Sequence, residues 1–141
     1  MPPKQLDNLV KVGKLKEEPP TQVELDGFLY AGSAKLKDAE NATLALESRF
    51  DLAYNAAHAL ALAALRFRGY RSDNRYLVFQ TLEHTVALPP EQWRVLDACH
   101  RKRNIAEYEG VVDVDEKLLE ALIRVARDVE ARVKALGRVP S

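Results

Sequence analysis

Apolar residues recur three and four positions apart along almost the whole chain, and proline, glycine or helix-capping residues separate the segments that carry this pattern. The spacing is typical of amphipathic α-helices, and no segment shows a convincing strand alternation. We expect helices over these approximate ranges: one that ends near 17, one from 21 to 38, one from 43 to 68, one from 72–74 to 86, one from 90 to 108, and one from 113–116 to 136.

The breaks between these helices are short. Pro19-Pro20 and Pro89-Pro90 interrupt the helical pattern, and Thr21 with Glu24 has the form of a capping box. Short connections favour antiparallel neighbours, so the sequence predicts an all-α fold, an antiparallel up-and-down helical bundle of five to six helices. We expect one domain over 1–141, with a core bundle at about 39–136 and the N-terminal helices of 5–38 packed on it.

The predicted helix 43–68 is rich in alanine between Ala53 and Ala64. Alanine favours helix strongly, and its small side chain lets neighbouring helices approach closely. We expect this helix to be the centre of the bundle.

Composition excludes several classes of protein. Lys plus Arg and Asp plus Glu both number 21, so the formal net charge is zero, which argues against a general polycation but leaves room for a local basic patch. Cys99 is the only cysteine, which excludes an internal disulfide and a zinc site built from cysteines. The N-terminus lacks a signal-peptide core, and the most apolar stretch, 56–65, is too short to span a bilayer. We expect a soluble cytoplasmic protein with no metal and no cofactor.

The first candidate site is a polar stripe on the central helix. Asp51, Tyr54, Asn55 and His58 are spaced i, i+3, i+4 and i+7, which places them on one helix face. The stripe either faces solvent or holds a structural hydrogen-bond network, or else it forms a site with Asp51 and His58 as its ionisable members.

Two basic segments are further candidates. One runs from His100 to Tyr108, and its three consecutive cations, Arg101, Lys102 and Arg103, are followed by a polar run that begins at Asn104. This pattern suits phosphate binding but also suits a solvated helix C-terminus. Earlier in the chain, arginines alternate with aromatic residues, as in grooves for single-stranded RNA, although these aromatic residues could equally be core anchors; the segment contains Arg66, Phe67, Arg68, Tyr70, Arg71, Arg75 and Tyr76.

The run from Arg103 through Asn104 to Tyr108 resembles the motif of the HEPN family, in which Arg is followed by a polar residue, often Asn, and then by His five positions after the Arg. The stretch from Ser48 to His58 also resembles the long helix of HEPN proteins. The resemblance covers roughly 39–136.

This resemblance implies an antiparallel bundle that usually pairs as a homodimer, with two copies of the motif in one cleft. Many HEPN proteins are metal-independent endoribonucleases, and others bind nucleotides or RNA without cleaving. By position, Arg103 would steady phosphate charge with Asn104 beside it. We assign RNA or phosphate binding to five residues: Arg101, Lys102, Asn104, Arg71 and Arg75.

The sequence departs from the family motif at its catalytic position. Tyr108 stands where the histidine is expected, and an unperturbed tyrosine, with a pKa near 10, is a poor general base at neutral pH. A second register starts from Arg101, puts Ala106 at the histidine position and leaves Tyr108 two residues later, where some HEPN toxins carry a tyrosine that a partner nucleotidyltransferase modifies. His58 could replace the missing base, with Asp51 either orienting it or pairing with Arg103.

We therefore expect a HEPN-like, RNA-directed protein that acts as a metal-independent endoribonuclease, with Arg103, Tyr108, His58 and Asp51 as catalytic candidates. Its expected role is that of a toxin or defence component in a toxin–antitoxin module, with an antitoxin or nucleotidyltransferase as partner. The alternative is a HEPN domain that binds RNA, a nucleotide or a partner protein without cutting.

Overall fold

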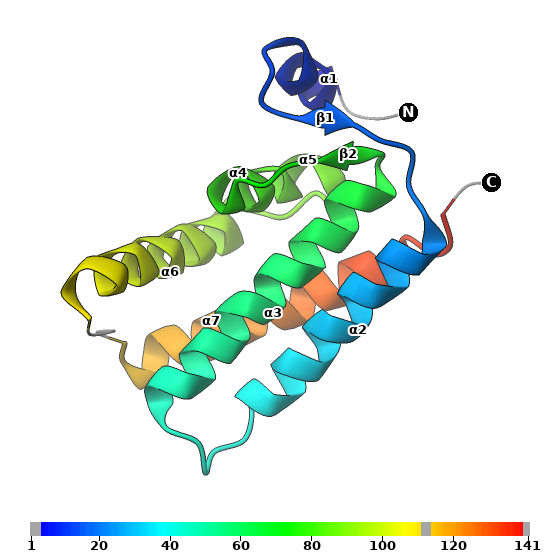
Figure 1. The fold of residues 1–141 in the computed structure, drawn as a ribbon. Coiled ribbons are helices and arrows are strands. Elements are labelled where there is room, and N and C mark those ends of the chain that lie inside the picture. Colours follow the sequence, from blue (N-terminus) through cyan, green and yellow to red (C-terminus); the bar gives the residue numbers. More distant parts are fainter. Residues whose placement is uncertain (1–3, 111–113, 140–141) are drawn as a thin grey trace.

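The computed structural model describes residues 4–110 and 114–139, and it confirms the predicted all-α helical bundle. Three long helices, α2 (Gln22–Ala39), α3 (Leu46–Phe67) and α7 (Glu116–Ala135), lie side by side (Figure 1). Helix α2 runs antiparallel to α3 and α7. The neighbours on both sides of α3 place the alanine-rich helix at the centre, as its composition indicates.

The contact between α2 and α3 is close because small residues line it. Ala53, Ala56 and Ala57 on α3 are fully buried. Gly32 on α2 lies directly against Leu60, since a Cβ atom added to this glycine would meet the Leu60 Cγ at 2.6 Å. A glycine at this position therefore sets how closely the two helices approach.

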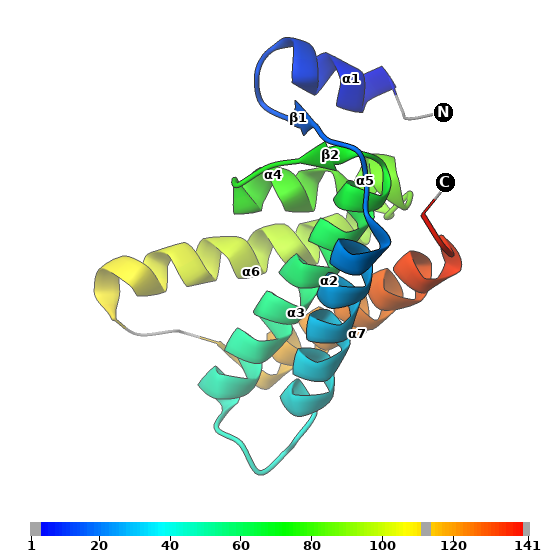
Figure 2. The same ribbon diagram turned by 45° about the vertical axis from the view of Figure 1, so that its right-hand side comes forward.

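Helix α6 (Pro90–Glu109) and the short helices α4 (Arg75–Gln80) and α5 (Leu82–Thr85) form the other side of the molecule. Figures 1 and 2 show the C-terminal end of α6 standing clear of α3 and α7. The sequence predicts one helix from 72–74 to 86, whereas the structure divides it at Thr81, whose hydroxyl donates to the Val78 carbonyl at 2.7 Å.

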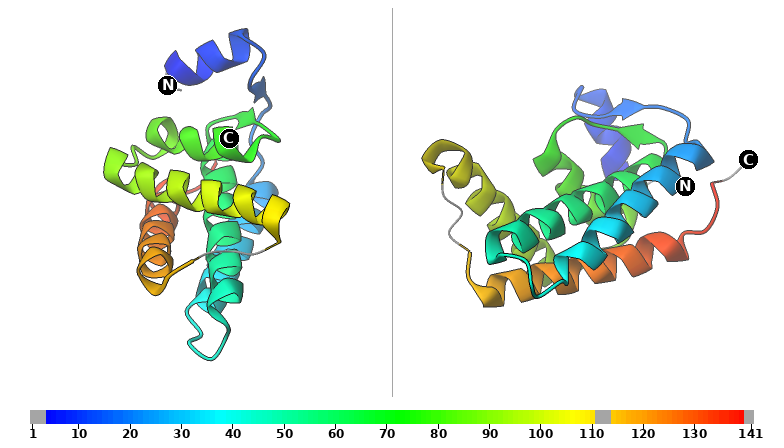
Figure 3. Two further views of the ribbon diagram at one scale, coloured as in Figure 1. Left: turned by 90° about the vertical axis from the view of Figure 1, so that its left-hand side faces the viewer. Right: turned by 60° about the horizontal axis from the view of Figure 1, so that its bottom comes forward.

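The N-terminal segment crosses one end of the bundle (Figure 3). Helix α1 (Lys4–Lys11) ends well before residue 17, so the prediction of a helix to that point was wrong. Gly13 adopts a positive φ of 78°, and the chain then forms strand β1 (Lys16–Glu17), which pairs antiparallel with β2 (Tyr70–Arg71). Pairing with a distant segment overrides the local helical pattern of this stretch.

A buried arginine fastens this segment to the end of α3. The Arg66 side chain is only 2% exposed and donates to the Glu24 carboxylate at 3.2 and 3.3 Å. It also donates to the backbone carbonyls of Glu18, Pro19 and Tyr70 at 3.0, 2.9 and 3.2 Å. The hydrogen bond from Arg66 is the main reason that the pKa of Glu24 lies below its usual range.

Side chains cap the helices where the sequence indicates. The Thr21 hydroxyl accepts from the Glu24 amide at the start of α2, and Asp115 accepts from the Leu118 amide at the start of α7. Within the predicted start at 72–74, Asn74 is the cap of α4, and its side chain accepts from the Leu77 amide at 3.0 Å. In the two described ranges, no helix is long and apolar enough to cross a membrane.

Candidate functional site

The polar stripe of α3 faces α6 and α4, with Tyr54 at its centre. Tyr54 is 1% exposed, and its hydroxyl lies 2.9 Å from Nδ1 of His100 on α6. The Phe79 ring of α4 packs edge-on against Tyr54, with their centres 5.5 Å apart. Three helices thus meet around one tyrosine ring, and we call the cluster of Asp51, Tyr54, Arg75, His100 and Arg103 the Tyr54 site.

His100 is held at both ring nitrogens. The Asn104 amide nitrogen lies 3.2 Å from Nε2 and can only donate, so Nε2 accepts and the proton of the neutral ring sits on Nδ1, where it is donated to Tyr54. Burial lowers the pKa of His100, and Arg75 and Arg103 lower it further against the opposing charges of Asp97 and Glu107. The imidazole is therefore neutral at pH 7.

Arg103 extends from α6 across the face of Tyr54. Its guanidinium carbon lies 4.8 Å from the centre of the tyrosine ring, within the range of a cation–π contact. One guanidinium nitrogen forms an ion pair with the Asp51 carboxylate. Of the two roles proposed for Asp51, pairing with Arg103 is the one that the geometry provides.

Arg75 brings a second cation to the same ring from the start of α4. Its guanidinium carbon lies 5.8 Å from the Tyr54 ring centre, and its side chain donates to Oδ1 of Asn55 at 3.1 Å. The Asn55 amide in turn donates to the Asp51 carbonyl at 2.9 Å. Burial raises the pKa of Tyr54, and the two arginines oppose that rise only in part.

His58 lies one turn beyond Asn55, partly buried, with its ring edge-on to Phe79 at 5.8 Å. Burial, followed by the charges of Arg75 and Arg103, lowers the pKa of His58 to about 4. The ring is neutral at physiological pH, as a proton acceptor must be.

The remaining predicted site residues are Arg71, Arg101, Lys102 and Tyr108, and none of them belongs to the Tyr54 site. Arg71 pairs with Glu18 and Glu24 at 2.6 Å, in the Arg66 network. Arg101 pairs with Asp97 at 3.2 Å, one turn away on α6, and Lys102 is partly buried on the same helix. Tyr108 is 91% exposed at the end of α6. The structure thus brings together Asp51, Arg75, Arg103 and Asn104, with His58 beside Phe79, and leaves Arg71 and Tyr108 apart from them.

His100 stands at the start of the basic run 100–108, but the sequence prediction gives it no role in the site. A signal for it exists, because Leu96, Cys99, His100 and Arg103 are spaced i, i+3, i+4 and i+7. Leu96 and Cys99 are buried, so this stripe is the inward face of α6, and it carries His100 and Arg103 toward α3.

The Tyr54 site holds groups that can bind an anion and accept a proton. Two guanidinium groups can bind phosphate oxygens, and a neutral imidazole beside them can accept a proton. Within the described ranges, no group of three or more His, Cys, Asp or Glu side chains could hold a metal ion.

Comparison of the chain with models of known protein families, with curated proteins and with solved structures finds no match. Function is therefore inferred from the residues of the Tyr54 site and from the sequence resemblance.

Proposed function

We propose that this chain is a HEPN-like, RNA-directed protein and acts as a metal-independent endoribonuclease at the Tyr54 site. The observation that carries the proposal is the placement of two guanidinium groups, Arg75 and Arg103, over one tyrosine ring whose hydroxyl is hydrogen-bonded to the neutral His100. Cleavage of RNA by attack of its 2′-hydroxyl requires cations that attract the phosphate and a base that accepts the hydroxyl proton.

In this mechanism the ribose 2′-oxygen attacks the neighbouring phosphorus and the bond from phosphorus to the 5′-oxygen breaks. Once the exposed Asn104 amide moves away from Nε2, that nitrogen of His100 takes the 2′-hydroxyl proton. Water gives a proton to the leaving 5′-oxygen, and the imidazolium returns its proton to the resulting hydroxide. The products are a 2′,3′-cyclic phosphate and a 5′-hydroxyl. Arg103 keeps donors for the phosphate while one nitrogen pairs with Asp51, because a guanidinium carries five N–H groups.

Binding without cleavage is the second candidate, and one observation favours it. Tyr54 and Asn104 occupy both nitrogens of the His100 ring, so the imidazole has no vacant acceptor until Asn104 moves. A site that stays in this arrangement would hold RNA or a nucleotide through Arg75 and Arg103 and leave it intact.

Incubating the purified protein with mixed RNA in EDTA, and measuring RNA binding in parallel, tests both candidates. Cleavage that Arg103→Ala abolishes supports the endoribonuclease. Binding that Arg103→Ala weakens, without cleavage by the wild type, supports the second candidate. If Arg103→Ala loses neither RNA cleavage nor RNA binding, both candidate functions are contradicted.

The toxin role and the homodimer remain parts of the proposal that come from the resemblance. The toxin role predicts that expression slows cell growth and that Arg103→Ala relieves the effect. The homodimer is expected to bury the exposed end of α6, where Ile105 is 51% and Tyr108 is 91% exposed. Sedimentation of the wild type and of Ile105→Asp tests this interface, since the substitution should shift a dimer to monomer.

A further inference from the structure

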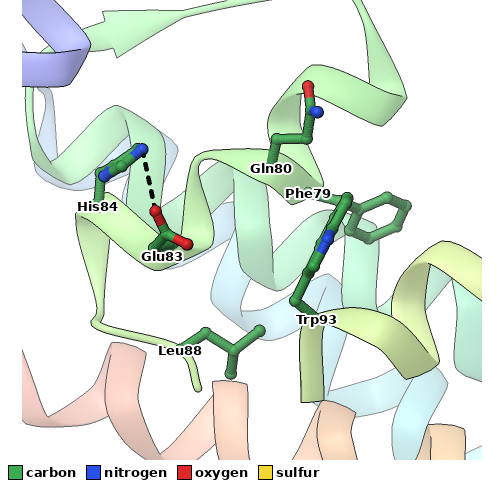
Figure 4. Close-up of a pocket in the computed structure, with 6 residues that line it drawn as sticks. All are labelled: Phe79, Gln80, Glu83, His84, Leu88 and Trp93. Carbon is green, nitrogen blue, oxygen red and sulfur yellow. Dashed lines mark ion pairs between the residues drawn. The ribbon is translucent and has the colours of Figure 1, made fainter. Parts of the chain in front are cut away.

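A pocket of about 200 Å³ opens between α4, α5 and the first turn of α6. Figure 4 shows Trp93 on one side of it and Glu83 with His84 on the other. Three apolar side chains, Phe79, Leu88 and Trp93, and three polar ones, Gln80, Glu83 and His84, form its lining. Pockets for drug-sized ligands occupy about 300 to 1,000 Å³, so this one suits a single planar ring system.

Aromatic contacts join this pocket to the Tyr54 site. The Phe79 ring lines the pocket and also contacts Tyr54 and His100, at 5.5 and 6.4 Å between ring centres. The Tyr76 ring lies 5.6 Å from Trp93 and 5.0 Å from His100. The rings of Phe79 and Tyr76 therefore connect the lining of the pocket to the Tyr54 site.

The polar side of the pocket selects among the bases. The Glu83 carboxylate only accepts hydrogen bonds, and guanine is the base with two adjacent N–H donors on its Watson–Crick edge. The Nε2 atom of His84 lies 3.5 Å from Glu83, beside this carboxylate. Adenine and cytosine would instead present a ring nitrogen acceptor to the carboxylate, and uracil would present one donor between two acceptors.

We propose that this pocket binds a guanine base, stacked on Trp93 and held at its Watson–Crick edge by Glu83. The proposal rests on the proposed function, because it makes the pocket the base-recognition subsite of an RNA whose phosphate lies at the Tyr54 site. Stacking on an aromatic face gives affinity, and the carboxylate gives the preference for guanine.

The chain offers a direct probe, because Trp93 is its only tryptophan. Titration with GMP, AMP, CMP and UMP, followed by tryptophan fluorescence and corrected for nucleotide absorption, should give saturable quenching with GMP at the lowest concentration. Glu83→Gln should weaken GMP binding about tenfold or more, given the strength of hydrogen bonds to a charged group. The matched control Glu120→Gln, on the exposed face of α7, should leave GMP binding unchanged.

Absence of quenching by all four nucleotides, equal quenching by all of them, a preference for another base, or GMP binding that Glu83→Gln leaves unchanged would overturn the assignment. The titration needs no RNA cleavage, so it separates this proposal from the endoribonuclease. RNA cleavage without GMP binding would contradict the guanine pocket alone. GMP binding together with RNA binding and cleavage that Arg103→Ala leaves unchanged would contradict the Tyr54 site alone.

Discussion

The Tyr54 hydroxyl and the Nδ1 atom of His100 lie 2.9 Å apart, although 46 positions separate the two residues in the chain. This contact joins the central helix α3 to α6. Because Tyr54 is buried and His100 is only partly so, the pair lies at the boundary between the core and the surface that RNA would reach.

The ion pair between Asp51 and Arg103 is expected to limit RNA binding. Asp51→Asn removes the competing carboxylate, so RNA should bind several-fold more tightly at low salt. Arg103→Ala should act in the opposite direction and reduce the slope of log affinity against log salt by about 0.7, the value for one phosphate contact on a single strand. Filter binding across a salt series measures both effects.

Asp26→Asn, on the exposed side of α2, is the control for the change in net charge. An equal gain in affinity for Asp26→Asn and Asp51→Asn would show that only the total charge matters, and the role given to the ion pair would be wrong.

His58 should make the fold sensitive to mild acid. Its pKa falls from 6.5 to about 4 in the folded protein because burial disfavours the charged ring, with Arg75 and Arg103 adding to the effect. Between these two values the unfolded chain binds a proton that the folded chain does not, so the free energy of unfolding should fall as pH decreases from 6.5 to 4. One such group contributes at most about 1.4 kcal/mol per pH unit.

His58→Gln should flatten the dependence of unfolding free energy on pH over that window, as measured by urea denaturation at a series of pH values. His84→Gln is the matched control. A wild-type curve no steeper than that of His58→Gln would contradict the buried, neutral state of this ring.

The Arg66 network should contribute strongly to stability. Arg66→Met leaves the carbonyls of Glu18, Pro19 and Tyr70 without their donor and deprives Glu24 of one of its two arginines. We expect a loss of about 3 kcal/mol, because three backbone carbonyls lose a charged donor. In the exposed pair of Arg127 and Glu40, Arg127→Met should cost less than about 1 kcal/mol. Similar losses for the two variants in thermal or urea denaturation would refute this difference.

Two glycines on α2 should respond in opposite directions to alanine. Gly32→Ala forces a Cβ atom against the buried Leu60 side chain and should destabilise the fold by about 1–3 kcal/mol. Gly27 has nothing within 4 Å of an added Cβ, so Gly27→Ala should stabilise α2 by up to about 1 kcal/mol through helix propensity. A denaturation midpoint that rises for Gly32→Ala would show that α2 and α3 are less closely packed, and one that falls for Gly27→Ala would contradict the expected gain in helix propensity.

The sequence predicts most of the fold because helical periodicity and capping are local. Thr21, Pro90 and the segment 113–116 mark helix starts in the sequence. Thr21, Pro90 and Asp115 stand at these starts in the structure, and Asp113 lies outside the described residues. The stretch after Lys11 could not be predicted in this way, because β1 exists only through its pairing with β2, which is more than 50 positions away.

The sequence predicts which face of α3 carries the polar residues of the Tyr54 site, but it does not predict which face of α6 meets them. The stripe from Asp51 to His58 is visible as a helical spacing, but the face that α6 turns toward it depends on tertiary packing. The face carrying Arg101 and Tyr108 is equally regular in the sequence, and burial of Leu96 and Cys99 is what selects the face of His100 and Arg103 instead. Burial of this kind follows from the arrangement of three helices and not from any one of them.

Cleavage of mixed RNA in EDTA by the wild type, His100→Gln, Arg103→Ala and the exposed control Arg124→Ala tests the central claim most directly. We expect the wild type and Arg124→Ala to cut at equal rates, leaving 2′,3′-cyclic phosphate ends, and His100→Gln to be slower by about 10²–10⁴, the usual contribution of a general base. Arg103→Ala should lose cleavage as well. Wild-type protein that cuts no RNA, or cleavage that survives both His100→Gln and Arg103→Ala, would contradict the assignment of the Tyr54 site as an endoribonuclease centre.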